Sequence, residues 1–330
     1  MTYPLLLPVT VSLLSLAAAN APTQKEVKLA VERTIPLLQK SGEIYLEKRQ
    51  CFSCHNQGLP ILALTAARRQ GFAIDGKKLQ RQIEFTADFL RRNRKRYEEG
   101  RGTGGQVFTA GYALWALAEA NWKPDETTQA VAHYLLQRDQ KLGYWQTREN
   151  RPPSEFSSLT ATFVALRSLQ TFASDDDEGL LRQRIDKIRA WLSKVRPSET
   201  EERVFKLWAL ALVQADPNEL VAARNALIET QNSDGGWSQL DGKASDAYAT
   251  GTALVALHRA GGLAVTSPIY RRGLKFLIQT QLGDGSWRVE SRSRPFQTYF
   301  ESGFPHGKHQ FISITATSWA VMALAAAGNG

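Results

Sequence analysis

Two cysteines and a histidine form the motif of this chain that is best suited to chemistry. They stand as Cys51-Phe52-Ser53-Cys54-His55, and the sequence contains no other cysteine. Two thiols at this spacing can form thioethers with the vinyl groups of a porphyrin, and the adjacent histidine can bind the iron from the same face. The motif therefore predicts a c-type haem and a redox function. A Cys51–Cys54 disulfide, or two unrelated thiols, are the alternatives.

The N-terminal segment predicts export. Residues 5–19 are almost wholly apolar, and small residues follow at the positions that a signal peptidase accepts. We therefore expect residues 1–21 to be a signal peptide and residues 22–330 to form one domain in the bacterial periplasm or elsewhere outside the cytoplasm. Covalent haem attachment takes place outside the bacterial cytoplasmic membrane, so the signal and the cysteine motif support each other.

The remainder of the chain repeats one unit six times. An apolar helix ends each unit, and successive helices recur at intervals of roughly 45 to 55 residues with a longer last interval, close to the period of two helices with their loops. Amphipathic, charged segments alternate with these apolar helices, so the apolar ones are buried inside the amphipathic ones. The pattern predicts an all-α fold, an (α/α)6 barrel of six helical hairpins. The repeated register is Ala63-Leu64, Ala116-Leu117, Ala165-Leu166, Ala211-Leu212, Ala256-Leu257 and Ala323-Leu324.

Three connections in the barrel carry a glutamine, a glycine and a tryptophan in that order. Gln231-Asn-Ser-Asp-Gly-Gly-Trp237 and Gln281-Leu-Gly-Asp-Gly-Ser-Trp287 are the clear copies, and the stretch that ends at Trp145 is a looser one. These copies resemble the Q-x(2–5)-G-x-W repeats of the terpenoid cyclase and protein prenyltransferase superfamily, over most of residues 25–327. We interpret the tryptophans as packing clamps between repeats.

The same resemblance directs attention to the starts of the inner helices. Squalene-hopene-type cyclases carry D-x-D-D-T-A there, and the matching stretch, Asp246-Ala-Tyr-Ala-Thr-Gly251, keeps only the first aspartate. Prenyltransferases bind zinc through a D-x-Y-H-T segment, and Ala249 stands in place of its histidine. Both chemistries are therefore unexpected. A haem motif before a Leu-Pro helix resembles exported bacterial proteins that are labelled squalene-cyclase-like.

A long insertion, residues 288–311, lengthens the sixth connection and predicts a lid over the barrel mouth. We expect it to bring His306 or His309 toward His55, as a second axial ligand of the iron or as a metal site, with Glu301 orienting one imidazole. A zinc site formed by Cys51, Cys54 and two of these histidines is the alternative. The candidate catalytic residues at this mouth are Asp246, Tyr248, Tyr299 and Glu301.

The net charge of +9 is concentrated in the run Arg91-Arg92-Asn93-Arg94-Lys95-Arg96. A solvated helix end explains this run, and attraction to anionic lipid headgroups is a further interpretation. The run lacks interleaved aromatic residues, so we expect no nucleic-acid partner.

The main prediction is a haem-dependent oxidoreductase or electron-transfer protein that acts with a redox partner on an apolar, isoprenoid-like ligand. The alternatives are a haem-free cyclase or prenyltransferase relative, and a non-catalytic barrel that binds lipid or protein.

Overall fold

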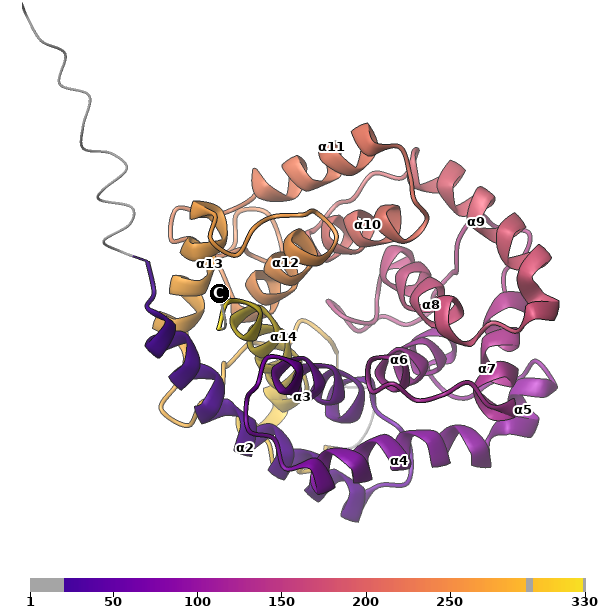
Figure 1. Ribbon diagram of the computed structural model, residues 1–330, viewed down its shortest axis with the longest axis horizontal. Coiled ribbons are helices and arrows are strands. Elements are labelled where there is room, and N and C mark those ends of the chain that lie inside the picture. The colour runs from indigo at the N-terminus through magenta and orange to yellow at the C-terminus, as the bar shows by residue number, and fades with distance from the viewer. Residues whose placement is uncertain (1–20, 295–298, 329–330) are drawn as a thin grey trace, which may run out of the picture.

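The computed structural model describes residues 21–294 and 299–328. Within these residues the chain is helical and forms no strand, only two isolated backbone bridges. Figure 1 shows the helices arranged as two concentric rings, so the predicted α/α toroid is confirmed. The export signal falls almost wholly on residues outside the described part, and the division at residues 21 and 22 stays a prediction.

The inner ring consists of helices that are apolar on nearly every face. These helices lie inside the barrel because a helix that is apolar on every face is stable only when other helices cover it. Each predicted Ala-Leu register lies in one of them. The inner helices are α3 (Leu59–Arg69), α6 (Gln106–Glu119), α8 (Ser158–Phe172), α10 (Thr200–Leu212), α12 (Ala247–Arg259) and α14 (Gln310–Ala327).

The outer ring consists of amphipathic helices whose polar faces meet the solvent. Several begin at a side-chain cap, such as the reciprocal pair between Thr23 and Glu26. The outer segment that follows Asp75 is divided into two helices at Asn93, whose side chain donates to the Phe89 carbonyl at 2.8 Å. The outer helices are α2 (Gln24–Lys48), α4 (Gly76–Arg92) with α5 (Arg94–Glu98), α7 (Glu126–Gln137), α9 (Glu178–Leu192), α11 (Pro217–Ile228) and α13 (Pro268–Thr280).

Three tryptophans clamp neighbouring elements together, as the sequence predicts. Each is fully or almost fully buried, and its indole N–H donates to the carbonyl of the residue ten positions earlier. The backbone N–H of each tryptophan donates to a threonine hydroxyl on the next inner helix. The clamps therefore join an outer helix, its connection and the following inner helix. They are Trp145, Trp237 and Trp287, bonded to Leu135, Leu227 and Leu277 at 2.7, 2.9 and 2.8 Å.

The two ends of the chain close the ring. Helix α14 packs between α12 and α3, and α13 lies beside α2. The hydroxyl of Thr34 in α2 donates to the carbonyl of Gly285 at 2.6 Å. Gly285 has a φ of +86°, and a Cβ atom there would lie 2.6 Å from the carbonyl oxygen of Arg33. A glycine is therefore required for the close approach that completes the toroid.

Aromatic side chains fill the centre of the barrel. Trp115, Phe163, Phe205, Trp208 and Trp319 lie with neighbouring ring centroids 4.7 to 6.4 Å apart. One described segment, Gly307–Ala327, is long and apolar enough to cross a membrane, but 83% of its most apolar stretch is buried. Burial of this kind is typical of an inner helix of a toroid.

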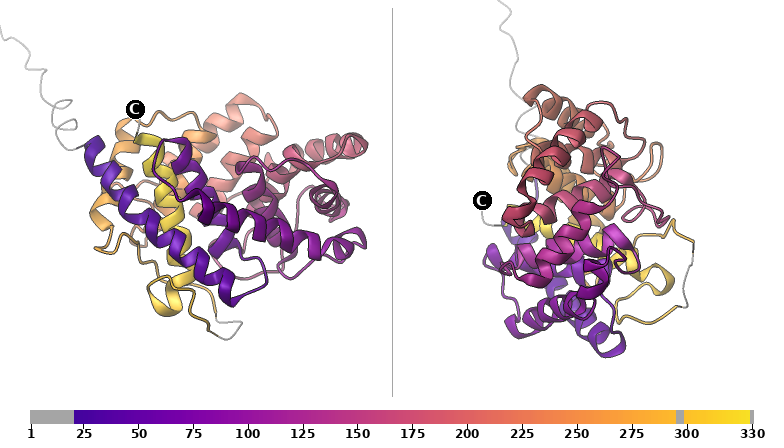
Figure 2. Two further views of the ribbon diagram at one scale, coloured as in Figure 1. Left: turned by 60° about the horizontal axis from the view of Figure 1, so that its bottom comes forward. Right: turned by 90° about the vertical axis from the view of Figure 1, so that its right-hand side faces the viewer.

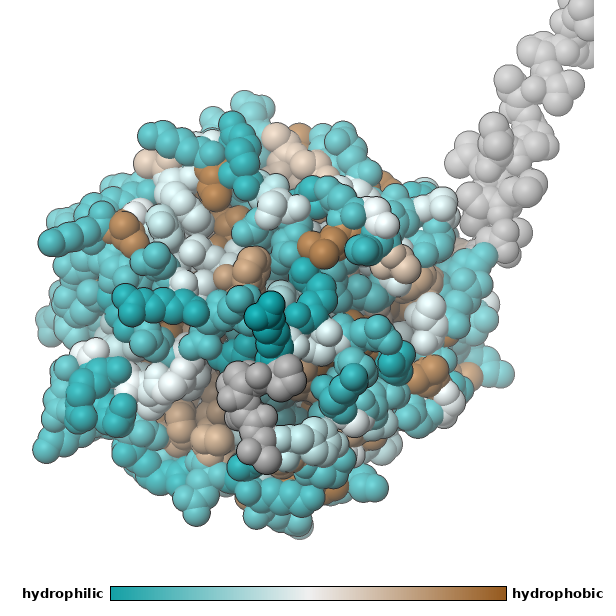
Figure 3. Space-filling view, turned by 180° about the vertical axis from the view of Figure 1, so that it is seen from behind, coloured by the Kyte–Doolittle hydropathy of each residue, from teal (hydrophilic) through white to brown (hydrophobic). Residues whose placement is uncertain are grey.

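The connections that lead from outer to inner helices lie together at one end of the barrel. Figure 2 shows them projecting from one side in its right-hand view, with the C-terminal end of α14 at the opposite end. We call this end the mouth. Figure 3 shows the mouth face, which is mostly hydrophilic with small, separate apolar areas. The candidate site lies here.

Candidate functional site

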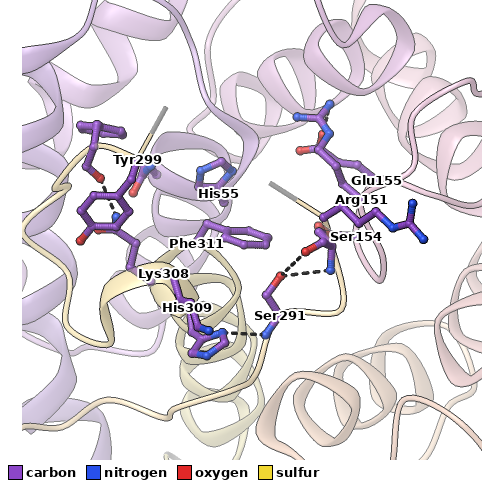
Figure 4. A pocket seen from close by; sticks show the side chains of 14 residues that line it. His55, Arg151, Ser154, Glu155, Ser291, Tyr299, Lys308, His309 and Phe311 are labelled. Carbon is purple, nitrogen blue, oxygen red and sulfur yellow. Dashed lines mark hydrogen bonds and ion pairs between the residues drawn. The ribbon is translucent and has the colours of Figure 1, made fainter. Parts of the chain in front are cut away.

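A cavity of about 340 Å³ opens at the mouth. Three connections that are distant in sequence enclose it: the one before α3, the one before α8 and the one before α14. Figure 4 shows His55 and Phe311 side by side in the centre of this cavity, with Arg151 and Glu155 across from them. The cavity therefore combines aromatic, basic and acidic groups.

The connection before α14 crosses the mouth. We name its described residues, 288–294 and 299–311, the lid segment. On one side Ser41 of α2 donates to the carbonyl of Ser302 at 3.1 Å. On the other side Ser293 donates to the Pro152 carbonyl at 3.0 Å. The lid segment is thus tied to both sides of the toroid.

An ion pair adds a further tie to the lid segment. The guanidinium of Arg292 lies 3.0 Å from the carboxylate of Glu199, which directly precedes α10. The same guanidinium donates to the side-chain oxygen of Gln239 at 2.8 Å. Glu199 is buried, so this pair connects the lid segment to the interior of the mouth.

The predicted histidines have different surroundings. His55 and His309 line the same cavity. The edge of the His55 ring faces Phe311, with ring centroids 5.7 Å apart, and burial together with the charge of Arg151 lowers its pKa to about 3. His55 is therefore neutral at physiological pH. The Nδ1 atom of His309 accepts the Ser291 backbone N–H at 3.0 Å.

His306 lies elsewhere, with its Nε2 atom 2.7 Å from the hydroxyl of Ser286. It is not among the residues that line the cavity. Its backbone has a φ of +85°, which starts the short helix Gly307–His309. Of the two loop histidines, His309 therefore lines the cavity together with His55, and His306 does not.

Glu301 does not orient an imidazole, contrary to expectation. Its carboxylate accepts the hydroxyl of Tyr299 at 2.7 Å and the backbone N–H of Gly303 at 2.8 Å. These contacts fix the local conformation of the lid segment. Tyr299 is 54% exposed and lies at the rim of the cavity.

The two cysteines lie in different environments. Cys54 is buried, its thiol faces the Phe108 carbonyl at 3.8 Å, and burial raises its pKa well above the ordinary value. Cys51 is exposed, with its sulfur 3.5 Å from the hydroxyl of Tyr45. The motif serves instead as a helix start, because Ser53 caps the short π-helix Cys54–Gly58 that leads into α3.

The predictions of haem c and of a zinc site are wrong. Within residues 21–294 and 299–328, no three His, Cys, Asp or Glu side chains lie close enough together to hold a metal ion. The physical reason is that the spacing of Cys51 and Cys54 fixes their distance along the chain but not their exposure. One sulfur is packed into the core while the other faces solvent. The prediction that three histidines act as metal or axial ligands is therefore wrong as well; they are His55, His306 and His309.

Asp246 and Tyr248 make hydrogen bonds that fix the start of α12. One carboxylate oxygen of Asp246 accepts the backbone N–H groups of Tyr248 and Ala249 at 2.9 and 3.0 Å. The other accepts the Gln239 amide at 3.1 Å. Asp246 is thus a helix cap with both oxygens occupied.

Sequence reasoning missed a second acid below the mouth, Glu201 in the first turn of α10. The hydroxyls of Tyr248 and Thr160 donate to its carboxyl oxygens at 2.9 and 3.2 Å. Burial raises the pKa of Glu201 well above its usual value. A glutamate in the first turn of an apolar inner helix is the signal that would have indicated it.

Sequence reasoning also missed Glu155 in the connection before α8. Its side chain is buried and pairs with Arg151, which also binds Glu149 at 2.8 Å. Burial raises the pKa of Glu155, and the positive charge of Arg151 opposes this rise without cancelling it. Only its position two residues before Ser157, the cap of α8, could have drawn attention to it.

No protein-family model matches the chain. Among curated proteins it is 32% identical over 207 residues to a drimenyl diphosphate synthase from Streptomyces showdoensis, which covers 56% of this chain and 36% of that protein. A drimenyl diphosphate synthase from Streptantibioticus cattleyicolor is 31% identical over 185 residues, covering 51% of this chain and 32% of that protein. The chain thus spans about a third of the length of these relatives.

Solved structures of other α/α toroids superpose on this chain. The type II terpene cyclase MstE from Scytonema superposes with a TM-score of 0.53 at 14% identity, over 93% of this chain and 99% of that one. This chain has a terpene cyclase-like fold. An unsaturated glucuronyl hydrolase from Streptococcus agalactiae superposes with a TM-score of 0.56 at 14% identity, over 98% of both chains. At such low identity these likenesses show the toroid alone.

Proposed function

We propose that this chain is a haem-free, terpene cyclase-like protein that binds an isoprenoid-like ligand in the mouth cavity. The observation that carries the proposal is the cavity itself, whose volume of about 340 Å³ lies in the range of small-molecule sites. Phe300 and Phe311 of the lid segment form apolar walls of this cavity. Apolar walls with a few polar groups are typical of sites for apolar molecules.

The rim of the cavity is basic. Arg294 and Lys308 are exposed side chains of the lid segment that line the opening. They would attract an anionic end of the ligand while its hydrocarbon chain lies against the aromatic walls. The relatives are named as drimenyl diphosphate synthases, and a variant of MstE has been crystallised with geranylgeranyl dihydroxybenzoate. A linear isoprenoid with an anionic end is therefore the ligand class that we propose.

Calorimetric titration with farnesyl diphosphate and with farnesol tests this proposal. The double variant Arg294→Gln, Lys308→Gln should bind farnesyl diphosphate about fivefold more weakly, because two exposed ion pairs contribute roughly 1 kcal/mol together. Its affinity for farnesol should stay unchanged. Arg148→Gln is the matched control, because Arg148 is exposed on the connection before α8 but does not line the cavity.

A variant that fills the cavity gives an independent check. Ser154 lines the cavity, and Ser154→Trp should weaken the binding of both ligands by at least about tenfold, because an indole would occupy their space. Failure of the wild-type protein to bind either ligand, or unchanged binding by Ser154→Trp, would contradict the proposed site.

A further inference from the structure

A second cavity, of about 330 Å³, lies in the side wall of the barrel. Helices α9, α10 and α11 enclose it together with the connection that follows α9. Figure 1 shows α9 and α11 as neighbours in the outer ring, with α10 inside them. Among the described residues the side-wall cavity and the mouth cavity share no lining residue, so they are separate sites.

Helix α10 presents charged side chains to this cavity, which sets it apart from the other inner helices. The first seven residues of those five helices contain no charged side chain. The first seven of α10 contain Glu201, Glu202, Arg203 and Lys206. Arg203, Lys206 and Leu210 are spaced by three and four residues, so they lie on one face of the helix. All three line the side-wall cavity, so this face of α10 borders a cavity in the outer ring.

The charged groups of the side-wall cavity leave an excess of one positive charge. The cations Arg196, Arg203 and Lys206 line it, and so does one acid, Glu219. The guanidinium of Arg203 is neutralised by the carboxylate of Asp241, with contacts of 3.0 and 3.2 Å. Two cations then remain against one acid. The cavity therefore suits an anion with a single charge.

The two remaining cations keep hydrogen-bond donors for a ligand. The Nζ atom of Lys206 donates to the Val195 carbonyl at 2.9 Å, and an ammonium group has three N–H donors. Arg196 is exposed, and its guanidinium donates to two backbone carbonyls at 3.3 and 3.4 Å. Burial and then the charge of Arg196 lower the pKa of Lys206, while Glu219 opposes this change. An anion beside Lys206 would stabilise its ammonium form.

The rest of the lining is largely apolar. Leu192 and Leu210 are buried and form the base of the cavity. Helix α11 contributes small side chains to the opposite wall: Ala222, Ala223 and Ala226. An apolar base beside a few polar groups is typical of sites that orient a small molecule with one polar end.

We propose that the side-wall cavity binds a small amphiphilic carboxylate. The carboxylate lies against Lys206 and Arg196, and the hydrocarbon chain lies against Leu192 and Leu210. A carboxylate matches the single excess charge better than a phosphate group does, since a phosphate monoester carries about −1.5 to −2 charges at neutral pH. This site is independent of the proposed function, because it lies on other helices and takes another ligand.

NMR titration with octanoate and with octanol tests the charge recognition. The wild-type protein should bind octanoate at least about tenfold more tightly than octanol, because a hydrogen bond to a charged group is stronger than one between neutral groups. Lys206→Gln should weaken octanoate binding about tenfold and change octanol binding by less than about twofold. Lys194→Gln is the matched control, because Lys194 is exposed on the same connection and does not line the cavity.

Two further measurements locate the ligand. Octanoate should protect the amine of Lys206 from an acylating reagent and leave Lys308 of the mouth cavity reactive, as measured by mass spectrometry. Ala226→Phe should weaken the binding of both ligands at least about tenfold, because a phenyl ring would occupy their space. Ala226 is exposed, so this substitution leaves the core intact. Val221→Phe is the matched control, because Val221 is exposed on α11 and does not line the cavity.

The outcomes that overturn the inference are specific to this site. They are an absence of octanoate binding, protection of Lys308 in place of Lys206, and equal effects of Lys206→Gln and Lys194→Gln. Inorganic phosphate that binds as tightly as octanoate would refute an amphiphilic ligand. If Lys206→Gln does not fold, Ala226→Phe decides, and unchanged binding would then refute the site. None of these measurements uses an isoprenoid, so their failure leaves the proposed function of the mouth cavity standing.

Discussion

Replacement of Arg292 by methionine should destabilise the protein, because it breaks the ion pair that ties the lid segment to the mouth. The side chain of Glu199 is 6% exposed and that of Arg292 is 27% exposed. Methionine keeps most of the apolar stem of arginine, so the main loss is the charge opposite Glu199. The variant therefore leaves a buried carboxylate without its main partner.

The size of the effect follows from this burial. Removal of one partner from a fully buried ion pair destabilises proteins by about 3–5 kcal/mol, whereas an exposed pair contributes about 0–1 kcal/mol. The pair lies between these limits because Arg292 is partly exposed, so we expect the free energy of unfolding to fall by about 2 kcal/mol. Arg288→Met is the matched control in the same segment. Its partner Glu290 is 71% exposed, and the loss should stay below about 0.5 kcal/mol.

The effect of Arg292→Met should depend on pH. Burial raises the pKa of Glu199, and the charge of Arg292 lowers it, so the variant raises this pKa further. Folding favours the neutral form of a carboxyl group whose pKa is raised in the folded protein. The free energy of unfolding therefore falls as the pH rises and this group ionises. Glu202, Arg203 and the buried Glu201 are further charged or titratable groups that interact with Glu199. The loss should therefore be larger at about pH 8 than at about pH 5.

Urea denaturation of the wild type, Arg292→Met, Glu199→Gln and the double variant measures the coupling directly. We expect a coupling free energy of about 1–2 kcal/mol between the two sites. The reasoning would be refuted by additive effects of the two substitutions, or by equal losses in Arg292→Met and Arg288→Met.

Three further predictions concern the clamps, the histidine and the thiols. Trp237→Phe should lower the free energy of unfolding by about 1–3 kcal/mol, because the buried indole hydrogen bond is lost and a space remains. The control variant Trp122→Phe, nearer the surface, should lower it by less than about 1 kcal/mol. Equal losses for the two variants in chemical denaturation would contradict the clamp. His55 should show no imidazole titration between about pH 5 and pH 8 by NMR, because desolvation and the charge of Arg151 lower its pKa to about 3; an ordinary titration near the pKa of free histidine would contradict this desolvation. An alkylating reagent should modify Cys51 in the folded protein and Cys54 only after unfolding, because a buried thiol with a raised pKa is a poor nucleophile. Equal rates of alkylation of the two cysteines, measured by mass spectrometry, would contradict the packing of Cys54.

The cysteine motif shows where prediction from the sequence failed. The spacing of Cys51 and Cys54 is the same whether both sulfurs face a porphyrin or one of them packs into the core. The structure places Cys54 against the first turn of α6, a segment more than fifty residues further along the chain. No local pattern contains that contact, so the motif alone could not distinguish the two cases.

The sequence alone determined the order of the helices, their division into two rings and the tryptophan clamps. These features are local, because a helix that is apolar all round, a capping residue or a Gly-x-Trp turn is defined within a few neighbouring residues. The tertiary structure alone decided which side chains meet at the mouth. His55, Glu155 and Phe311 come from three segments that are far apart in the chain, and desolvation at the mouth raises the pKa of Glu155 and lowers that of His55. Desolvation depends on everything that surrounds a group, and the sequence does not specify those surroundings until the ring has closed.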